Sequence, residues 1–134
     1  MLTDAAGNVA ERYSYDAYGY VSVTDGGGVA VPVNGWGTPH SAVGNPFLFT
    51  GRRLDEEAGL YYYRARFYDP IKGRFLQRDP MGYADGPNLY EYANSAPTSH
   101  IDPWGLNGEF VKQGSWFRQE GDEYNILVRA PRDY

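Results

Sequence analysis

The sequence has no cysteine, only two methionines and no long apolar segment. Without cysteine there can be no disulfide framework and no thiolate chemistry. No segment approaches the roughly twenty apolar residues that a membrane-spanning helix requires. Residues 1–8 also lack a basic segment followed by an apolar one, so we expect neither a membrane span nor a signal peptide in this chain.

Positive charge is scarce as well, because 12 Lys and Arg residues stand against 17 Asp and Glu residues. A nucleic-acid surface needs clustered cations to replace the counterions of phosphate groups, so we expect no nucleic-acid partner. The nucleophile motif G-x-S-x-G and a glycine-rich loop that opens a helix are also missing. His40 and His100 have no third ligand at metal spacing, and we therefore expect no metal and no cofactor.

Tyrosine, glycine and proline are abundant, with 13, 17 and 9 residues in a chain of 134. Tyrosine fits a pleated, half-buried surface, while frequent glycine and proline end elements too early for long helices. We therefore predict a mainly β fold made of short antiparallel hairpins. The first hairpin is expected in residues 1–24, where Asp-x-x-Gly turns at 4–7 and 16–19 flank an alternating segment.

The middle of the chain predicts a connection and then a meander. Residues 25–46 are rich in Gly and Pro and have no sustained period, whereas residues 47–77 predict three antiparallel strands. In the middle strand, alternation assigns the odd positions from 61 to 67 to the core and the even positions, including Arg66, to a wetter face.

A short helix is predicted near residues 86–94. Leu89, Tyr92 and Ala93 recur there at helical spacing, and Asn88 is a suitable capping residue. This helix is the one exception that we expect in an otherwise β-rich chain.

The sequence Asp-Pro-x-Gly occurs twice, at 79–82 and 102–105, and Arg78 directly precedes the first copy. Asp, Pro and Gly at these positions are typical of a tight turn, so one interpretation is two turns without chemistry. The other is a single site, since two carboxyl groups that lie close together can share a proton and act on a peptide bond. Spacing leaves both interpretations open, and it also leaves Glu91 as an alternative partner for Asp79.

Two segments resemble a known family. ERYSYDAYG, at 11–19, resembles the YD repeat. Residues 49–106 resemble the Rhs repeat-associated core domain, with G-L-Y-Y-Y-R-A-R-F-Y-D-P, G-R-F-L-Q-R-D-P-x-G, N-L-Y-x-Y and D-P-x-G-L in that order. In these large bacterial and related polypeptides, YD repeats wind a hollow β-shell around a variable C-terminal toxin, and the core domain closes the shell. The resemblance therefore implies a fragment of an antiparallel β-shell.

The resemblance also implies an aspartyl-type autoprotease that cuts its own chain just after D-P-x-G-L. Carried over residue by residue, Asp79 and Asp102 form the catalytic pair, and Arg78 tunes or orients Asp79. The implied cut lies between Leu106 and Asn107.

On this basis we expect four segments: a YD-repeat hairpin (1–24), a connection (25–46), the core (47–106), and the start of a truncated variable cargo (107–134) with one strand at 124–130. The expected partners are the remainder of the parent shell, its cargo and an immunity protein for that cargo. The parent is expected to be secreted or at the cell surface, through a secretion system. Two repeats at most cannot enclose a cargo, so we expect the fragment alone to be inactive. The alternative hypothesis is a non-catalytic structural or cell-surface adhesion module.

Overall fold

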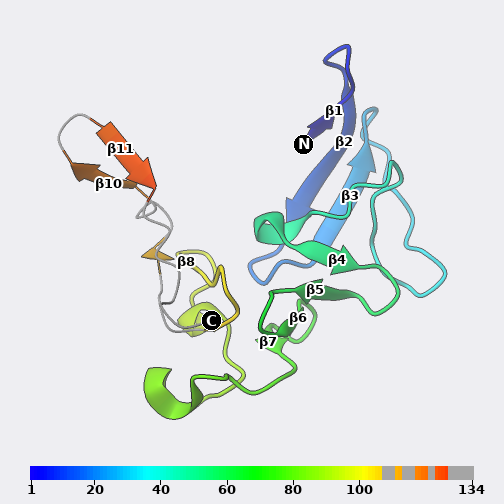
Figure 1. Ribbon diagram of the computed structural model, residues 1–134. Helices are drawn as coiled ribbons and strands as arrows, with labels where there is room; N and C mark the ends of the chain where they lie inside the picture. The colour runs from blue at the N-terminus through cyan, green and yellow to red at the C-terminus, as the bar shows by residue number, and fades with distance from the viewer. Residues whose placement is uncertain (107–110, 113–116, 121–122, 127–134) are drawn as a thin grey trace.

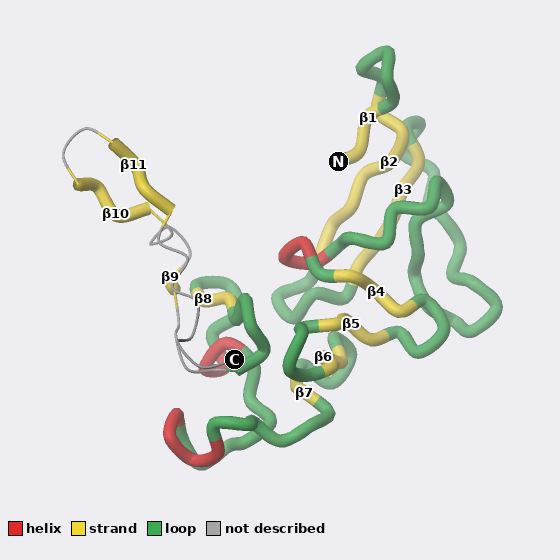
Figure 2. Tube along the Cα trace, in the orientation of Figure 1, coloured by secondary structure: helices red, strands yellow, loops and turns green. Residues whose placement is uncertain are grey.

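The computed structural model describes residues 1–106, 111–112, 117–120 and 123–126, which form short antiparallel strands and no α-helix (Figure 1). The strands are β1 (Leu2–Thr3), β2 (Val9–Tyr15), β3 (Val21–Asp25), β4 (Arg53–Asp55), β5 (Leu60–Tyr62), β6 (Phe67–Asp69), β7 (Arg74–Phe75), β8 (His100–Ile101), β9 (Val111–Lys112), β10 (Phe117–Glu120) and β11 (Glu123–Ile126). The 3₁₀ segments are η1 (Phe49–Gly51), η2 (Gly82–Asp85) and η3 (Ala93–Ser95). Loops and turns join these short elements (Figure 2). The prediction of a mainly β, antiparallel fold is confirmed.

The first sheet has the strand order β1-β2-β3 and contains the predicted N-terminal hairpin. In its turn, Asp16 Oδ1 accepts hydrogen bonds from the amides of Tyr18 and Tyr20, each at 2.9 Å. Gly19 closes the turn with a φ of 91°, a conformation that favours glycine. From β3 to η1 the chain runs mainly as a loop, as the composition of this segment predicts.

The second sheet corrects the predicted three-stranded meander, because it has the four strands β4-β5-β6-β7. The predicted middle strand is interrupted by a turn in which the Tyr63 amide donates to the Arg66 carbonyl oxygen at 2.9 Å. Arg64 takes a positive φ of 64° in this turn, so β5 ends just before it and β6 begins just after it. The turn between β6 and β7 forms as predicted, with the Gly73 amide donating to the Asp69 carbonyl oxygen at 2.8 Å.

The interruption changes which side chains face the core. Tyr61 and Tyr63 are buried, as alternation predicts, but Ala65 and Phe67 are exposed. Arg66, which alternation assigns to the wetter face, is only 1% exposed. A turn resets the two-residue period of a strand, so the alternation fails beyond position 63.

The helix predicted near residues 86–94 is wrong, because residues 86–92 form turns and a bridge, and only the last two positions belong to the 3₁₀ segment η3. The Asn88 side chain accepts a hydrogen bond from the Tyr90 amide at 3.2 Å, which makes an Asx turn instead of a helix cap. The backbones of Arg74 and Glu91 form an isolated antiparallel bridge. Pairing with the end of the second sheet thus replaces the helical hydrogen bonds that the apolar spacing favours.

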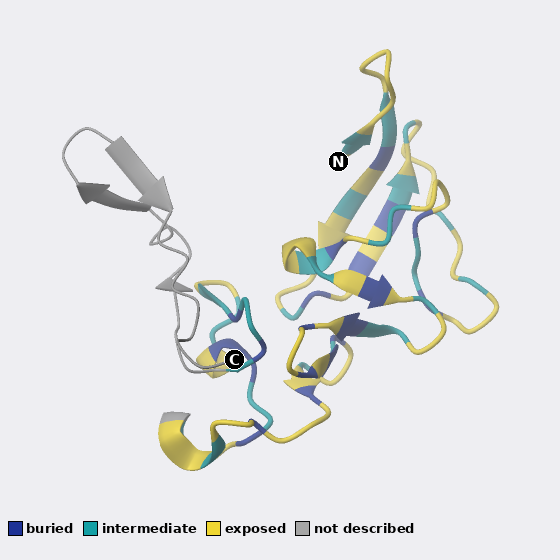
Figure 3. Ribbon diagram, in the orientation of Figure 1, coloured by how far each residue is buried: buried dark blue, intermediate teal, exposed yellow. Residues whose placement is uncertain are grey.

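Half of the buried core residues are aromatic, and the core joins the first two sheets to the start of η3 (Figure 3). The centres of the Tyr68 and Tyr92 rings lie 4.4 Å apart, and the Phe75 and Tyr63 rings pack edge to face with their centres 5.7 Å apart. Such aromatic pairs contribute about 0.5–1.5 kcal/mol each beyond their buried area. The buried apolar residues of this cluster are Val21, Val23, Leu48, Leu54, Tyr61, Tyr63, Tyr68, Phe75, Tyr92 and Ala93.

The remaining strands form two pairs, β8 with β9 and β10 with β11. Strand β11 confirms the first part of the strand predicted at 124–130, and its last part lies outside the described residues. Asn107, on the far side of the expected cut, also lies outside them. Within the described ranges, no helix has the length and apolar character needed to cross a bilayer.

Candidate active site

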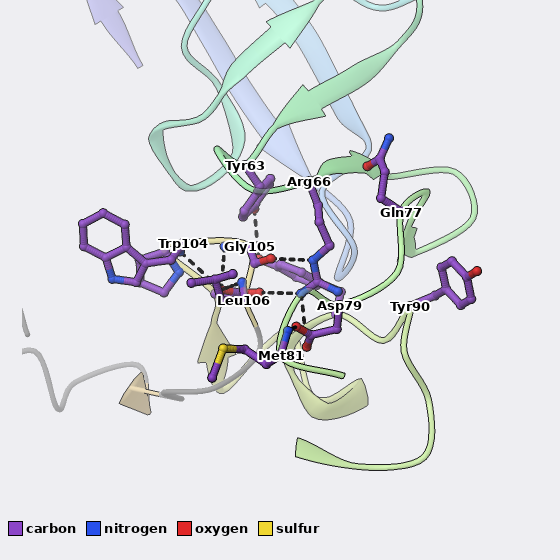
Figure 4. Close-up of polar contacts among 12 residues, drawn as sticks. Tyr63, Arg66, Gln77, Asp79, Met81, Tyr90, Trp104, Gly105 and Leu106 are labelled. Carbon is purple, nitrogen blue, oxygen red and sulfur yellow. Dashed lines mark hydrogen bonds and ion pairs between the residues drawn. The ribbon is translucent and has the colours of Figure 1, made fainter. Parts of the chain in front are cut away.

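The two Asp-Pro-x-Gly sequences meet at the guanidinium of Arg66 (Figure 4). Asp79 Oδ2 lies 3.8 Å from Arg66 Nη2, and Asp102 Oδ2 lies 3.4 Å from the same nitrogen atom. Asp79 is 6% exposed and Asp102 is 4% exposed, so both carboxylates are largely removed from water. Two carboxylates that are 23 positions apart in sequence therefore belong to one buried cluster.

Asp79 is held by the chain on both sides of it. Its amide donates to the Leu89 carbonyl oxygen at 2.9 Å, which fixes the backbone beside the segment before η3. Its Oδ1 accepts a hydrogen bond from the Met81 amide at 2.8 Å, and the Gly82 amide donates to the Asp79 carbonyl oxygen at 3.0 Å. The expected turn therefore forms, and its hydrogen bond from the Met81 amide uses only one of the two carboxylate oxygens of Asp79.

Asp102 holds the residues that follow it in a similar way. Its Oδ1 accepts hydrogen bonds from three amides, those of Trp104 at 3.3 Å, Gly105 at 2.8 Å and Leu106 at 3.2 Å. The backbone of Leu106, the last residue before the expected cut, thus lies directly beside the Asp102 carboxylate.

Arg66 comes from the turn between β5 and β6 and is the cation at the centre of the cluster. Its Nη1 donates to the Leu89 carbonyl oxygen at 3.2 Å, and its Nε donates to the Gly105 carbonyl oxygen. The guanidinium also lies 3.6 Å from the centre of the Phe75 ring. A buried arginine is tolerated when its fork of donors and its charge are both matched, as they are here.

Sequence reasoning missed Arg66, because it treated the arginines as the wet face of a continuous strand. The run Tyr-Tyr-Tyr-Arg-Ala-Arg offers no turn residue such as Gly, Asn or Asp, and the turn places Arg64 at positive φ without one. The cost of such a conformation for an ordinary residue argues against a turn when only the sequence is known. The one available signal is a pair of arginines inside an otherwise aromatic segment.

The other residues that the sequence predicts for the site lie in different surroundings. Arg78 is exposed, and within the described part of the chain its guanidinium forms no ion pair with Asp79. Glu91 is partly buried, and its Oε1 accepts a hydrogen bond from Ser95 Oγ at 2.6 Å. In the ranges that the structure covers, no group of three or more His, Asp or Glu residues is arranged to hold a metal ion.

A chain of three hydroxyl groups lies next to the cluster, and two of them, those of Tyr63 and Tyr92, belong to buried residues. Thr50 Oγ1 and Tyr63 Oη are 2.8 Å apart, and the hydroxyls of Tyr63 and Tyr92 are 3.0 Å apart. Burial raises the pKa of both tyrosines well above the ordinary value, so each keeps its proton at neutral pH. These hydroxyls pack the wall of the site and do not supply a base.

The arrangement supplies two carboxyl groups, one fixed cation and an adjacent peptide segment in a place with little water. Carboxyl groups in such a pair can serve as acid and base. The electrostatic field of a buried guanidinium is also stronger than it is in water, because the local dielectric constant is lower. The arrangement thus contains the kinds of group that a proton transfer at the backbone near Leu106 would require.

No family model matches this chain. It is 39% identical over 110 residues to the double-stranded DNA deaminase toxin A of Burkholderia cenocepacia, which covers 82% of this chain and 7% of that protein. It is 33% identical over 108 residues to the tRNA nuclease WapA of Bacillus subtilis, covering 78% of this chain and 4% of that protein.

Among solved structures, the crystal structure of TcdB2-TccC3 matches with a TM-score of 0.61 and 32% sequence identity. The match covers 78% of this chain and 4% of that chain. The chain thus spans less than a tenth of each of these three proteins. Its fold corresponds to a small segment of the TcdB2-TccC3 shell.

Proposed function

Because this chain is homologous over most of its length to Rhs/YD-repeat toxin proteins, we propose that it is the C-terminal core of such a protein's β-shell and that this core cuts its own chain after Leu106. The products are a core that ends at Leu106 and a tail that begins at Asn107. The tail is the variable cargo of the parent protein. The proposed partners are the rest of the shell, this cargo and an immunity protein that neutralises it.

One observation carries the proposal: Asp79 and Asp102, each from its own tight turn, approach the same nitrogen of Arg66 beside the Leu106 backbone. In the proposed reaction, a water oxygen bonds to the Leu106 carbonyl carbon and the bond to the Asn107 nitrogen breaks. One carboxylate takes a proton from the water, and the other carboxyl group gives a proton to the leaving nitrogen. Arg66 balances the negative charge that the two carboxyl groups bring to the site.

The proposed setting also explains why the core needs the rest of a shell. A carboxyl pair tolerates little displacement, since a shift of roughly 1 Å can cost on the order of a hundredfold in rate. Hairpins of a repeat architecture bury their apolar faces against neighbouring repeats, so the pair is held most firmly in the full assembly. Export of the parent through a secretion system remains part of this proposal.

The test is to express the complete polypeptide that contains this chain and to identify its fragments by intact mass and N-terminal sequencing. We expect a tail that begins at Asn107, and we expect Asp79→Asn and Asp102→Asn each to abolish it. The matched control is Asp69→Asn, because Asp69 precedes a proline and its Oδ1 likewise accepts a turn hydrogen bond, from Ile71, at 2.9 Å. Asparagine preserves that acceptor in all three variants, so loss of the turn cannot account for a difference between them.

The same experiment tests Arg78, which the sequence analysis expects to tune or orient Asp79. Arg78→Gln should leave cleavage near the parental rate, because the side chain is exposed. A large loss of cleavage in this variant would show that Arg78 contributes to the site.

A non-catalytic structural module is the second candidate, and one observation favours it. The same contacts that could support catalysis also balance the charge of Arg66 and hold the two Asp-Pro-x-Gly turns together. This structural role alone would account for them. This candidate predicts a complete parent chain that stays uncut across Leu106 and Asn107 while the Asp79→Asn variant unfolds more easily. An uncut, correctly folded parent would decide in its favour.

A further inference from the structure

Three consecutive carbonyl groups just before the proposed cut each accept a hydrogen bond from the same part of the chain. All three donors lie between η1 and β6, although no strand of the described residues pairs with this segment. The pairs are Arg52 Nη2 with the Pro103 oxygen, the Ala65 amide with the Trp104 oxygen at 3.4 Å, and Arg66 Nε with the Gly105 oxygen. Residues 103–105 are therefore held through their backbone, one carbonyl after another.

The side chains reinforce this contact. The guanidinium of Arg64 lies 4.1 Å from the centre of the Trp104 ring, a distance at which cation and ring attract each other. Arg64 is the residue that adopts positive φ, so the unusual turn places both its neighbour Ala65 and its own side chain against residues 103–105. A turn of higher conformational energy thus coincides with this contact.

Gly105 fits this place because it has no side chain. A Cβ at this position would overlap the Tyr63 carbonyl oxygen and would lie 3.4 Å from the Arg66 amide nitrogen. Gly82, at the same place in the first Asp-Pro-x-Gly turn and with a similar φ, has open space around it. The turn itself therefore does not require this close approach, and the surroundings of Gly105 do.

We propose that Arg52, the Ala65 amide and Arg66 form a carbonyl clamp for residues 103–105. This inference rests on the proposed self-cleavage and deepens it. The clamp fixes the position of the bond to be cut. The residue at position 105, a glycine here, determines whether residues 103–105 can bind in the clamp. Arg52 and Arg66 act here as positioning residues.

The clamp has a consequence for the products. All of its hydrogen bonds are made to residues on the amino-terminal side of the bond after Leu106, so cleavage breaks none of them. Two of the three donors are charged, and charge-assisted hydrogen bonds are roughly twice as strong as neutral ones. The new carboxyl end therefore stays docked on the core, and only the tail is released.

The first test compares Gly105→Ala with Gly7→Ala in the complete polypeptide. Gly7 also closes an Asp-x-x-Gly turn at positive φ, and a Cβ added there would meet nothing within 4 Å, so this variant carries the conformational cost without the overlap. We expect the cleavage rate to fall by about a hundredfold in Gly105→Ala, because the bond is displaced, and to be unchanged in Gly7→Ala. Equal rates in the two variants would overturn the clamp.

The second test examines the cleaved core with carboxypeptidase. The wild-type core should keep Leu106 for at least about ten times longer than Arg52→Gln, because loss of one charge-assisted bond loosens the end. Arg53→Gln is the matched control, since Arg53 is the exposed neighbour of Arg52. Trimming of the wild-type core as fast as that of Arg52→Gln would show that the end is not held.

Hydrogen exchange separates failure of the clamp from failure of the proposed cleavage. The Ala65 amide donates to the clamp in the uncut chain, so its exchange reports seating whether or not the chain is cut. Gly105→Ala should raise that exchange rate at least about tenfold over Gly7→Ala, since the protecting bond is lost. An uncut wild type with this difference refutes cleavage and supports the clamp, whereas the same exchange rate in both variants refutes the clamp.

Discussion

Replacing Arg66 by leucine should destabilise the fold strongly, because it leaves two carboxylates without their cation. Arg66 is 1% exposed and touches Asp79, Asp102 and the carbonyl oxygens of Leu89 and Gly105. Removing one partner of a buried ion pair typically costs about 3–5 kcal/mol, since the remaining charge stays buried and uncompensated. Two carbonyl groups also lose a donor, which adds about 1 kcal/mol each when water cannot replace it.

The expected loss for Arg66→Leu is therefore about 4–6 kcal/mol, because these contributions do not add fully. This is a large share of the free energy of unfolding of a typical folded domain, which is about 5–15 kcal/mol. The measurement is urea unfolding of the 134-residue chain, followed by tryptophan fluorescence and circular dichroism together. Arg53→Leu is the control, because Arg53 is exposed and should change stability by no more than about 0.5 kcal/mol.

A compensating variant separates the charge from the packing of Arg66 over Phe75. Adding Asp79→Asn and Asp102→Asn to Arg66→Leu removes both orphaned charges, and neutral replacement of a whole buried ion cluster is often close to neutral in stability. We expect the triple variant to regain at least about half of the loss. If the triple variant is no more stable than Arg66→Leu alone, the electrostatic reasoning is wrong and the ring contact carries the effect.

Two further predictions concern pH. Burial raises the pKa of four core tyrosines, so their stability contribution is complete below about pH 10 and falls above it by about 1.4 kcal/mol per unit and tyrosine. The four residues are Tyr61, Tyr63, Tyr68 and Tyr92. Urea midpoints should therefore fall steeply at alkaline pH, and the near-ultraviolet absorbance of tyrosinate should rise only as the chain unfolds. Ionisation of these groups in the folded chain would contradict this. Burial raises the pKa of Glu11, but hydrogen bonds from Tyr13, Ser41 and the Ala42 amide lower it by more. The contribution of Glu11 to stability is thus present above about pH 4.5 and lost on acidification. Glu11→Gln should lower the free energy of unfolding by about 1–3 kcal/mol and weaken its dependence on pH in the acidic range. Glu57→Gln, at an exposed position, should do neither.

The hairpins and their turns could be predicted from the sequence because each depends on few neighbouring residues. Asp16 and Asp69 form their turns through side-chain hydrogen bonds that reach only two to four positions along the chain. The pairing of β2 with β3 then follows from the alternation of the residues between such turns. Information of this range is present in any short window of sequence.

The surroundings of Arg66 could not be predicted, because they depend on segments that are far apart. The turn at 63–66 has no turn-forming residue of its own, and its contact with Trp104 lies nearly forty positions away. The failed helix at 86–94 has the same origin, since its backbone bonds to β7 and to Asp79 instead of to itself. Tertiary contacts override local preference at both places.

The choice between two turns and one site disappears when the two oxygens of each carboxylate are considered separately. In Asp79 and in Asp102, Oδ1 accepts the amide hydrogen bonds that shape the turn, while Oδ2 faces Arg66. Asp69 uses its Oδ1 in the same way, but its Oδ2 lies 3.7 Å from Lys72, an exposed cation at the surface. A turn fixes the orientation of its aspartate, so the second oxygen points in a direction that the backbone determines. What distinguishes the candidate site from an ordinary Asp-Pro turn is therefore the buried guanidinium that meets that oxygen, and this is why the Asp69→Asn control separates the contribution of the buried ion pair from that of the turn.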